Sequence, residues 1–296
     1  MTSSVAGIEA GTIRRVSFYF AAHQDDWQLF MNPSAFQDVI DRGTKSVFIH
    51  TTAGDAGLGT ESGDRGHPWY LARENGAEAA IRFMADADDL PPIDREVTAP
   101  TFHGHPIRRV GYRNTVAYFL RLPDGNPEGT GYAETKYQSL KRLAEGEARA
   151  ISAIDGSASY AGWFDLVATV RSLIEAERGE AASIQLNVPE LDSARNPNDH
   201  SDHYMTAKAA LEAARGLTAL RAHYVEYASA DLPENLSGHA RDMKCATYAV
   251  TLAAVLALDH PISWRHYDET FIGRNYFRLE EDASLSEISP PRAVVK

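Results

Sequence analysis

A strand–helix–strand pattern in the first fifty or so residues restricts the fold more than any other feature of this sequence. Val16–Ala22 (VSFYFAA) and Ser46–Thr52 (SVFIHTT) are short apolar runs, typical of strands buried on both faces. Between them, Asn32-Pro33 indicates a helix start and Gly43 a helix end, which predicts a helix reaching about Arg42. A strand, a helix and a second strand of these lengths form a right-handed parallel crossover. We therefore expect an α/β fold built on a parallel sheet.

The remainder of the chain continues this alternation. Thr115–Leu122 is apolar and fits a strand or the start of a helix. Further helices are expected at 69–84, 136–146, 163–178 and 199–215, and a further strand at 183–188. The helix at 163–178 is amphipathic, with an expected inner face of Phe164, Val167, Val170, Leu173 and Ile174. No composition shift divides the chain, so we expect one domain over residues 1–296, with 281–296 as a loose tail.

Charge and hydropathy exclude several classes of protein. The net charge of −12, without a Lys/Arg run, argues against binding to nucleic acid or to an anionic membrane surface. The longest apolar stretch, Cys245–Leu258, is too short to span a bilayer and predicts a buried helix. Met1–Gly11 lacks the pattern of a signal peptide, so a cytoplasmic location is expected. The composition is equally compatible with a monomer and with a homo-oligomer.

The single cysteine limits the chemistry of any metal site. With Cys245 alone, the 296-residue chain forms no intramolecular disulfide and no cysteine-based zinc site. Cys245 lies in an apolar helical run, where a buried, inert thiol is expected. A metal ion would therefore be held by histidines and carboxylates.

Two groups of histidines and carboxylates are candidates for such a site. His23, Asp25 and Asp26 stand directly after the first strand, and the carboxyl ends of parallel strands are where open α/β sheets bind ligands. His200 and His203 open the expected helix at 199–215, where residues at i and i+3 share a face. Either motif alone is weak, because chance gives about 0.4 HxxH pairs for 11 histidines in this length. Together they supply three or four ligands without cysteine.

These motifs resemble a known family. The AHQDD segment at 22–26 is similar to the AHPDDE signature of the LmbE-like, or PIG-L, zinc-dependent de-N-acetylases, and HSDH at 200–203 is similar to that family's HxDH signature. SVFIHTTAGDAG at 46–57 resembles the family's second strand and the loop after it, and LAREN at 71–75 resembles its Arg-bearing helix. The resemblance covers about 16–211 and implies a Rossmann-like, mostly parallel sheet flanked by helices.

The resemblance also implies a role for each residue of the two motifs. His23, Asp26 and His203 correspond to the zinc ligands, although Fe²⁺ or another divalent ion stays open as the metal. Asp25 corresponds to the general base that takes a proton from water. His200 corresponds to the group that stabilises the oxyanion or protonates the leaving amine.

Other residues near these motifs have less certain roles. Arg73 stands where the family places a substrate-binding arginine, although an arginine on a helix is as often simply solvated. Trp27 replaces the family's glutamate, and we expect it to pack beneath the site rather than stack on a sugar ring. Asp55 and the turn-rich loop at 123–132 could approach the pocket. His103 and His105 are expected in a surface turn.

Three readings of the function follow from the sequence. The first is a zinc-dependent hydrolase that removes the acetyl group from an N-acetylated amino sugar or glycoconjugate. The second is an amidase of the same family that acts on a non-sugar acylated metabolite or a thiol conjugate. The third is a non-catalytic sugar- or metal-binding relative, which the replacement of glutamate by Trp27 keeps open. In the first two, the partner is a small N-acylated molecule.

Overall fold

The sheet at the centre of the molecule has eight strands, five of them parallel. The computed structural model describes residues 13–87 and 90–281. The strand order is β12-β11-β10-β1-β2-β7-β6-β3, with β11, β10, β1, β2 and β7 parallel and the other three antiparallel to their neighbours. Its strands are β1 (Arg15–Ala21), β2 (Thr44–Thr52), β3 (Glu96–Thr98), β6 (Arg108–Tyr112), β7 (Thr115–Leu122), β10 (Ser183–Pro189), β11 (Leu220–Val225) and β12 (Tyr276–Glu281).

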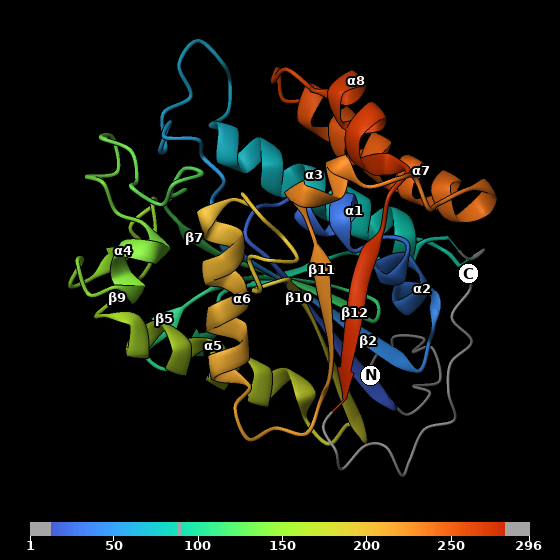
Figure 1. Ribbon diagram of the computed structural model, residues 1–296, viewed down its shortest axis with the longest axis horizontal. Helices are drawn as coiled ribbons and strands as arrows, with labels where there is room; N and C mark the ends of the chain where they lie inside the picture. Colours follow the sequence, from blue (N-terminus) through green and yellow to red (C-terminus); the bar gives the residue numbers. More distant parts are fainter. Residues whose placement is uncertain (1–12, 88–89, 282–296) are drawn as a thin grey trace, which may run out of the picture.

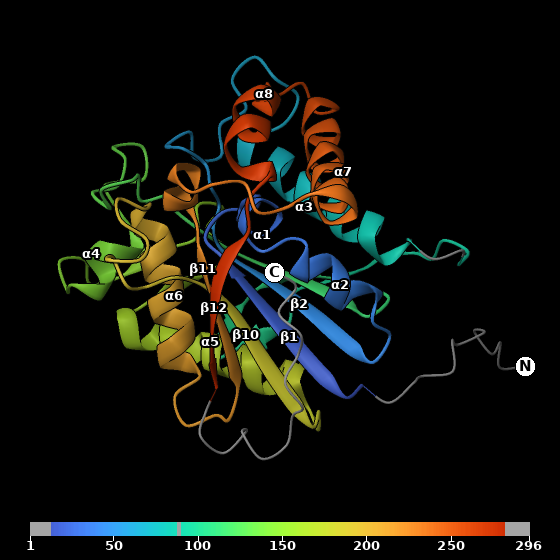
Figure 2. The same ribbon diagram turned by 45° about the vertical axis from the view of Figure 1, so that its right-hand side comes forward.

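Helices cover both faces of this sheet (Figures 1 and 2). The α-helices are α1 (Asp26–Phe30), α2 (Ser34–Ile40), α3 (Trp69–Ala85), α4 (Leu140–Ala144), α5 (Trp163–Arg178), α6 (Ser201–Ala213), α7 (Gly238–Leu256) and α8 (Trp264–Tyr267). The short elements are β4 (Thr101–Phe102) paired with β5 (His105–Pro106), β8 (Ile151–Ser152) paired with β9 (Ser159–Tyr160), the 3-10 turn η1 (Tyr227–Asp231) and the π turn η2 (Asp268–Ile272). The fold is therefore the α/β layer structure that the sequence predicts.

Two cores lie on opposite faces of the sheet. Side chains alternate along a strand, so Phe18 and Phe20 of β1 join a core with α4, α5 and α6, whereas Tyr19 joins a core with α1, α2, α3 and α7. All three side chains are fully buried. This two-sided burial explains why the parallel strands read as continuous apolar runs in the sequence.

Most of the predicted elements are confirmed, and several boundaries are corrected. The parallel crossover is present: β1 pairs in parallel with β2, and Phe18 lies opposite Val47. The apolar segment that fitted either a strand or a helix start is strand β7. The predicted helix at 163–178 is α5, but Phe164 on its expected inner face is 81% exposed. The helix predicted at 136–146 contains only Leu140–Ala144, because turns occupy the residues before Ser139, whose side chain caps the helix.

The helix after the first strand also differs from its prediction. It begins at Ser34, not at Asn32, and the Asn32-Pro33 peptide bond is cis. The side-chain oxygen of Asn32 still accepts a hydrogen bond from the backbone N–H of Phe36 at 3.1 Å. It thus provides an acceptor for one of the N–H groups that are free at the start of a helix. Directly after His23 and Asp25, the chain also forms the short helix α1. Hydrophobic periodicity did not predict this helix, because it has only five residues.

The C-terminal part of the chain forms a helical layer over α3. The helix α7 is longer than predicted, and one of its sides is open, with Leu256 55% exposed and Cys245 only half-buried, so the expectation of a fully buried helix and thiol is wrong. Within the part of the chain that the structure describes, no helix is long and apolar enough to cross a membrane. Of the tail predicted at 281–296, Glu281 is the last residue of β12, and the remainder lies outside the described residues, as does the N-terminal segment that lacks a signal pattern.

Candidate metal centre

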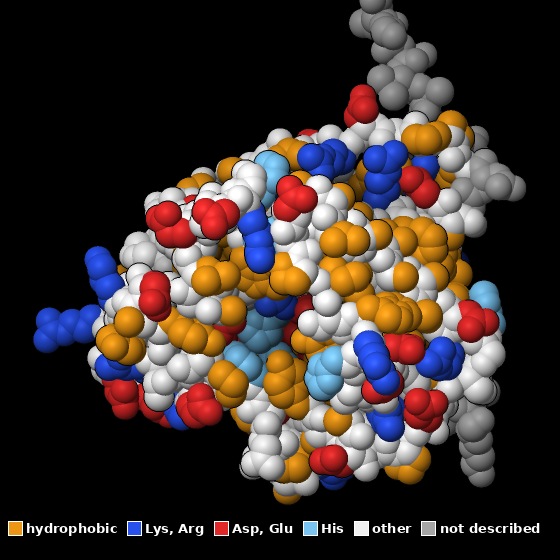
Figure 3. Space-filling view, turned by 90° about the horizontal axis from the view of Figure 1, so that it is seen from above, with side chains coloured by type: hydrophobic (Ala, Val, Ile, Leu, Met, Phe, Trp, Pro, Cys, Tyr) orange, Lys and Arg blue, Asp and Glu red, His pale blue; other side chains and the backbone are white. Residues whose placement is uncertain are grey.

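The candidate site lies at the carboxyl ends of all five parallel strands. Each strand delivers acidic or imidazole side chains to the same edge of the sheet, as expected for an open α/β fold. After β1 come His23, Asp25 and Asp26; after β2, Asp55; after β7, Asp124; after β10, Asp199, His200, Asp202 and His203; and after β11, Glu226. Figure 3 shows pale-blue histidine side chains in a hollow of this face, with hydrophobic side chains along its border.

Local structure holds the first motif in a tight turn. The backbone N–H of His23 donates to Oδ2 of Asp26 at 2.6 Å, and Asp26 is the first residue of helix α1. This bond leaves Oδ1 of Asp26 free to face the imidazole of His23. A carboxylate at the first turn of a helix is also favoured by the exposed N–H groups there.

Three ligand atoms from the two motifs meet at metal-binding spacing. Nδ1 of His23 lies 3.2 Å from Nε2 of His203, and Oδ1 of Asp26 lies 3.5 Å and 3.4 Å from these two nitrogens. Atoms that ligate one tetrahedral zinc ion at 2.0–2.1 Å are about 3.3 Å apart. The three residues are at least 95% buried, and they form one of the groups able to hold a metal ion. The structure therefore brings together the three residues predicted as ligands.

The electrostatic environment of these histidines favours positive charge. Burial alone would lower the pKa of His23, but Asp26, Asp202 and Asp124 raise it to about 10. Burial likewise opposes protonation of His203, and nearby carboxylates raise its pKa well above the ordinary value. A site that favours protons this strongly also suits a divalent cation, because both neutralise the same carboxylates.

Two carboxylates stand behind His203 on the side away from the ligand atoms. Nδ1 of His203 lies 2.8 Å from Oδ1 of Asp199 and 2.7 Å from Oε2 of Glu226, and the side chains of both acids are fully buried. A carboxylate on the second ring nitrogen fixes the tautomer and orientation of a metal-ligating histidine. Burial raises the pKa of Glu226 to about 8, despite the opposing charge of His203. Sequence reasoning missed Glu226, which belongs to no motif.

Replacing Glu226 by glutamine is expected to weaken zinc binding about 10- to 100-fold, the usual cost of losing a carboxylate behind a ligating histidine. Zinc affinity measured by competition with a chromophoric chelator would check this. Glu280→Gln is the matched control, because Glu280 is half-exposed on β12 and faces His223 rather than His203. Equal zinc affinities for the two variants would contradict the role given to Glu226.

Asp25 lies beside the three ligands and is held by Arg73. The guanidinium of Arg73, from α3, forms a close ion pair with Oδ1 of Asp25, and its Nη1 donates to the carbonyl of Gly54 at 2.9 Å. Gly54 has a positive φ of 54°, and a Cβ there would come within 2.5 Å of Arg73. Arg73 also lies over the ring of Trp69 at 5.7 Å. The arginine predicted to bind substrate thus contacts the predicted base.

His200 lies against the ring of His23 and has a defined tautomer. Its Nδ1 accepts the backbone N–H of Asp202 at 3.2 Å, which assigns the proton to Nε2. That nitrogen points toward Oδ1 of Asp124 at 3.8 Å. Burial, followed by the charges of His23 and His203, lowers the pKa of His200 to about 2. His200 is therefore a neutral imidazole with an N–H directed into the pocket.

Asp124 is a second residue that sequence reasoning missed. It lies in the 123–132 loop and lines the same pocket as His23 and His200. Asp55 supports it, because Oδ1 of Asp55 accepts the backbone N–H of Asp124 at 2.9 Å. Asp202, fully buried, likewise accepts the N–H of Gly125 at 2.8 Å. The available signal was a polar Pro-Asp-Gly turn directly after a buried strand.

Trp27 packs beneath the site and is excluded from substrate stacking. It is fully buried, and its ring lies 4.7 Å from that of Phe48 in the core shared by α1, α2 and α3. This confirms the expectation that the tryptophan is a core residue. Trp27 therefore packs under the first motif, in which both aspartates are present.

His103 and His105 lie away from the metal centre. Nε2 of His105 is 2.9 Å from Oδ1 of Asp165 on α5, and the ring of His105 lies against Tyr160. His103 is half-exposed and lies 3.8 Å from the same carboxylate. His103 thus lies in the predicted surface turn, whereas His105 begins strand β5 and its side chain is only 14% exposed, which corrects the expectation for His105.

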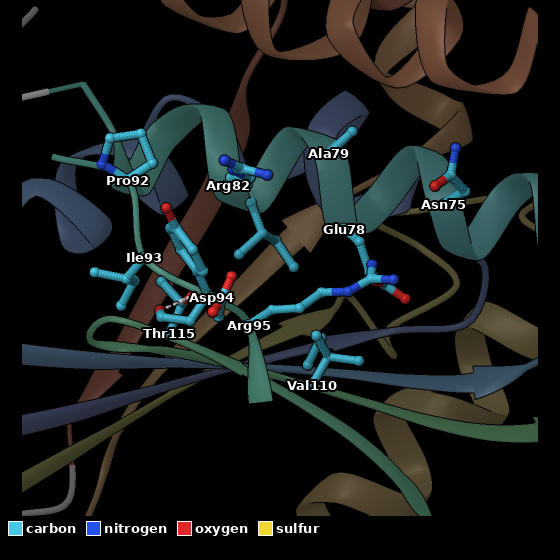
Figure 4. Close-up of a pocket in the computed structure, with 13 residues that line it drawn as sticks. Asn75, Glu78, Ala79, Arg82, Pro92, Ile93, Asp94, Arg95, Val110 and Thr115 are labelled. Atoms are coloured by element: carbon cyan, nitrogen blue, oxygen red, sulfur yellow. Dashed lines mark hydrogen bonds and ion pairs between the residues drawn. The ribbon is translucent and has the colours of Figure 1, made fainter. Parts of the chain in front are cut away.

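A cavity of about 720 Å³, larger than the pocket that His23 and His200 line, lies elsewhere, between α3 and strands β6 and β7 (Figure 4). Its charged side chains neutralise one another: Glu78 pairs with Arg95 and Arg108, and Arg82 with Asp86. Its lining contains no histidine. The smaller pocket lined by His23 and His200 is therefore the candidate site.

Comparisons with known proteins find likenesses only among solved structures. No family model and no curated protein matches the sequence. Among solved structures, the chain is similar to N,N'-diacetylchitobiose deacetylase from Pyrococcus horikoshii, with 13% sequence identity and a TM-score of 0.46. The match covers 94% of this chain and 87% of that chain.

Proposed function

We propose that the chain is a zinc-dependent amide hydrolase that removes the acyl group of an N-acylated amine, with the acetyl group of an N-acetylated amino sugar as its first candidate. The observation that carries the proposal is the spacing of His23 Nδ1, Asp26 Oδ1 and His203 Nε2, which lie 3.2–3.5 Å apart. Three protein ligands and an open fourth position are the usual arrangement of catalytic zinc. The two-histidine, one-carboxylate set also suits Fe²⁺.

The residues around the ligands supply the remaining chemistry. Zinc bound there would polarise the amide carbonyl and lower the pKa of water in the pocket. Asp25 takes a proton from the water as its oxygen bonds to the carbonyl carbon. When the C–N bond breaks, the same proton passes to the leaving nitrogen, so that a carboxylic acid and an amine result. Arg73 holds the Asp25 carboxylate in place through their ion pair.

His200 and Asp124 complete the pocket. The Nε2–H of His200 donates to the oxygen that becomes negatively charged as water adds, which stabilises that charge where it develops. Asp124 lines the same pocket and accepts hydrogen bonds, so it suits a hydroxyl or amide of the substrate. In this assignment Arg73 also contacts the substrate, because it lines the pocket together with Asp25.

The test is an activity assay on zinc-loaded protein. We expect the purified chain to bind one zinc ion and to release acetate from at least one member of a panel of N-acetylated amino sugars. Activity is expected to fall to background after chelation and to return with added zinc. Protein that binds zinc but hydrolyses no N-acyl compound, sugar or otherwise, would refute the hydrolase assignment.

A further inference from the structure

A small cavity of about 100 Å³ adjoins the metal pocket. The two share Asp25, Arg73 and Tyr267 in their linings. Because these three side chains border both spaces, the second cavity lies next to the metal pocket, on the side of Asp25. We call this space the side cavity.

The lining of the side cavity is mostly apolar. Leu252 and Val255 of α7 are buried, and Trp69, Tyr248 and Ile262 add two aromatic rings and a branched chain. Among its described lining residues, the only charged ones are the aspartate and arginine that it shares with the metal pocket, and these pair with each other. Gln24, Thr251 and Ser263 add neutral polar groups to part of the lining, but the faces of Leu252 and Val255 would leave some hydroxyls of a hydroxyl-rich group without hydrogen-bond partners.

Most of this lining comes from the helical layer that follows residue 211. The helix α7 lies close against α3 because Gly76 leaves room for it: a Cβ there would be 2.9 Å from Cγ2 of Thr251. Residues 261–263, just before α8, border the cavity as well. The C-terminal part of the chain therefore supplies most of the side cavity.

We propose that the side cavity binds the aliphatic part of the substrate's acyl group, and that the enzyme prefers short-chain N-acyl groups such as butyryl over acetyl. This rests on the proposed amide hydrolysis. In an N-acylated polar amine, the acyl chain is the part that an apolar space can accept without unpaired polar groups. A volume of about 100 Å³ holds roughly three water-sized groups, which fits the carbons beyond the carbonyl of a butyryl group.

The first experiment compares acyl chains on one amine. We expect zinc-loaded, full-length protein to hydrolyse the N-butyryl compound with about tenfold higher kcat/KM than the N-acetyl compound, since each buried methylene contributes about fourfold. The N-octanoyl compound exceeds the cavity and is expected to lose this advantage. Ile262→Trp, which fills the cavity from its rim, is expected to reduce the butyryl-to-acetyl ratio to about one. Leu256→Trp is the matched control, because Leu256 is 55% exposed on α7 and does not line the cavity.

The second experiment measures binding without turnover. Calorimetry with butyrate and acetate, the product acids, should show tighter binding of butyrate by about tenfold, and Ile262→Trp should remove the difference. If this preference holds while no amide is hydrolysed, the side cavity is supported and the proposed function is refuted. If butyryl and acetyl compounds react equally and the two acids bind equally, the side cavity is refuted while hydrolysis stands.

Discussion

Replacing Asp25 by asparagine is expected to reduce kcat/KM for N-acyl hydrolysis by about 10²- to 10⁴-fold, the range that a positioned general base contributes. Asparagine keeps the size of the side chain but does not accept a proton from water. Asp25 is not one of the three proposed ligands, because the carboxylate in that group is that of Asp26. Zinc content, measured by elemental analysis, should therefore stay at the wild-type level while turnover is lost.

Two further variants test whether the loss of turnover is due to the carboxylate of Asp25. Asp64→Asn removes one negative charge from an exposed position in the 53–66 loop and should leave kcat/KM unchanged. Arg73→Lys keeps the positive charge but loses the planar guanidinium that bridges Asp25 and Gly54, so a smaller loss in kcat is expected. Wild-type turnover by the Asp25→Asn variant would show that another group removes the proton from water.

Local patterns were sufficient for the parts of the fold whose burial is regular. β1 and β2 are buried on both faces, so their apolar runs mark them directly. The helix α5 was located to the residue because a glycine follows it and its apolar residues repeat with helical spacing. The prediction that Phe164 is buried was wrong. This residue stands in the first turn of the helix, beyond the edge of the core that α5 covers, and helical periodicity alone does not show which residues lie beyond that edge.

Local sequence patterns also predicted only some of the residues of the candidate site. His23 and His203 lie within short motifs, so spacing and position after a strand reveal them. Asp124 follows β7 and lines the pocket, whereas Glu226 follows β11 and lies behind His203, and only the order of strands in the sheet brings them to these places. The pairing of Arg73 with Asp25 was likewise hidden, because it joins positions 48 residues apart through the packing of α3. Side-chain contacts of this kind follow from topology, which local pattern does not specify.

Replacing His203 by glutamine is expected to remove stable zinc binding, with a loss of affinity beyond the 10- to 100-fold that carboxylates behind a ligand contribute. Nε2 of His203 is one of three ligand atoms, and two ligands rarely retain zinc at neutral pH. Activity should fall with the metal. Since a ligand that binds the folded state alone raises its stability, zinc should raise the Tm of the wild type but not that of the variant.

The comparison with His200→Gln separates metal binding from catalysis. His200 is five percent exposed and lies against His23, yet it is not part of the three-ligand group. This variant should keep both its zinc and the zinc-dependent rise in Tm while turnover falls about 10²- to 10³-fold, as for loss of an oxyanion donor. Circular dichroism before zinc addition shows whether each variant is folded. Were the folded His203→Gln protein to bind zinc as tightly as wild type, the ion would have to be held elsewhere, and the group formed by His23, Asp124, His200 and Asp202 would become the first alternative.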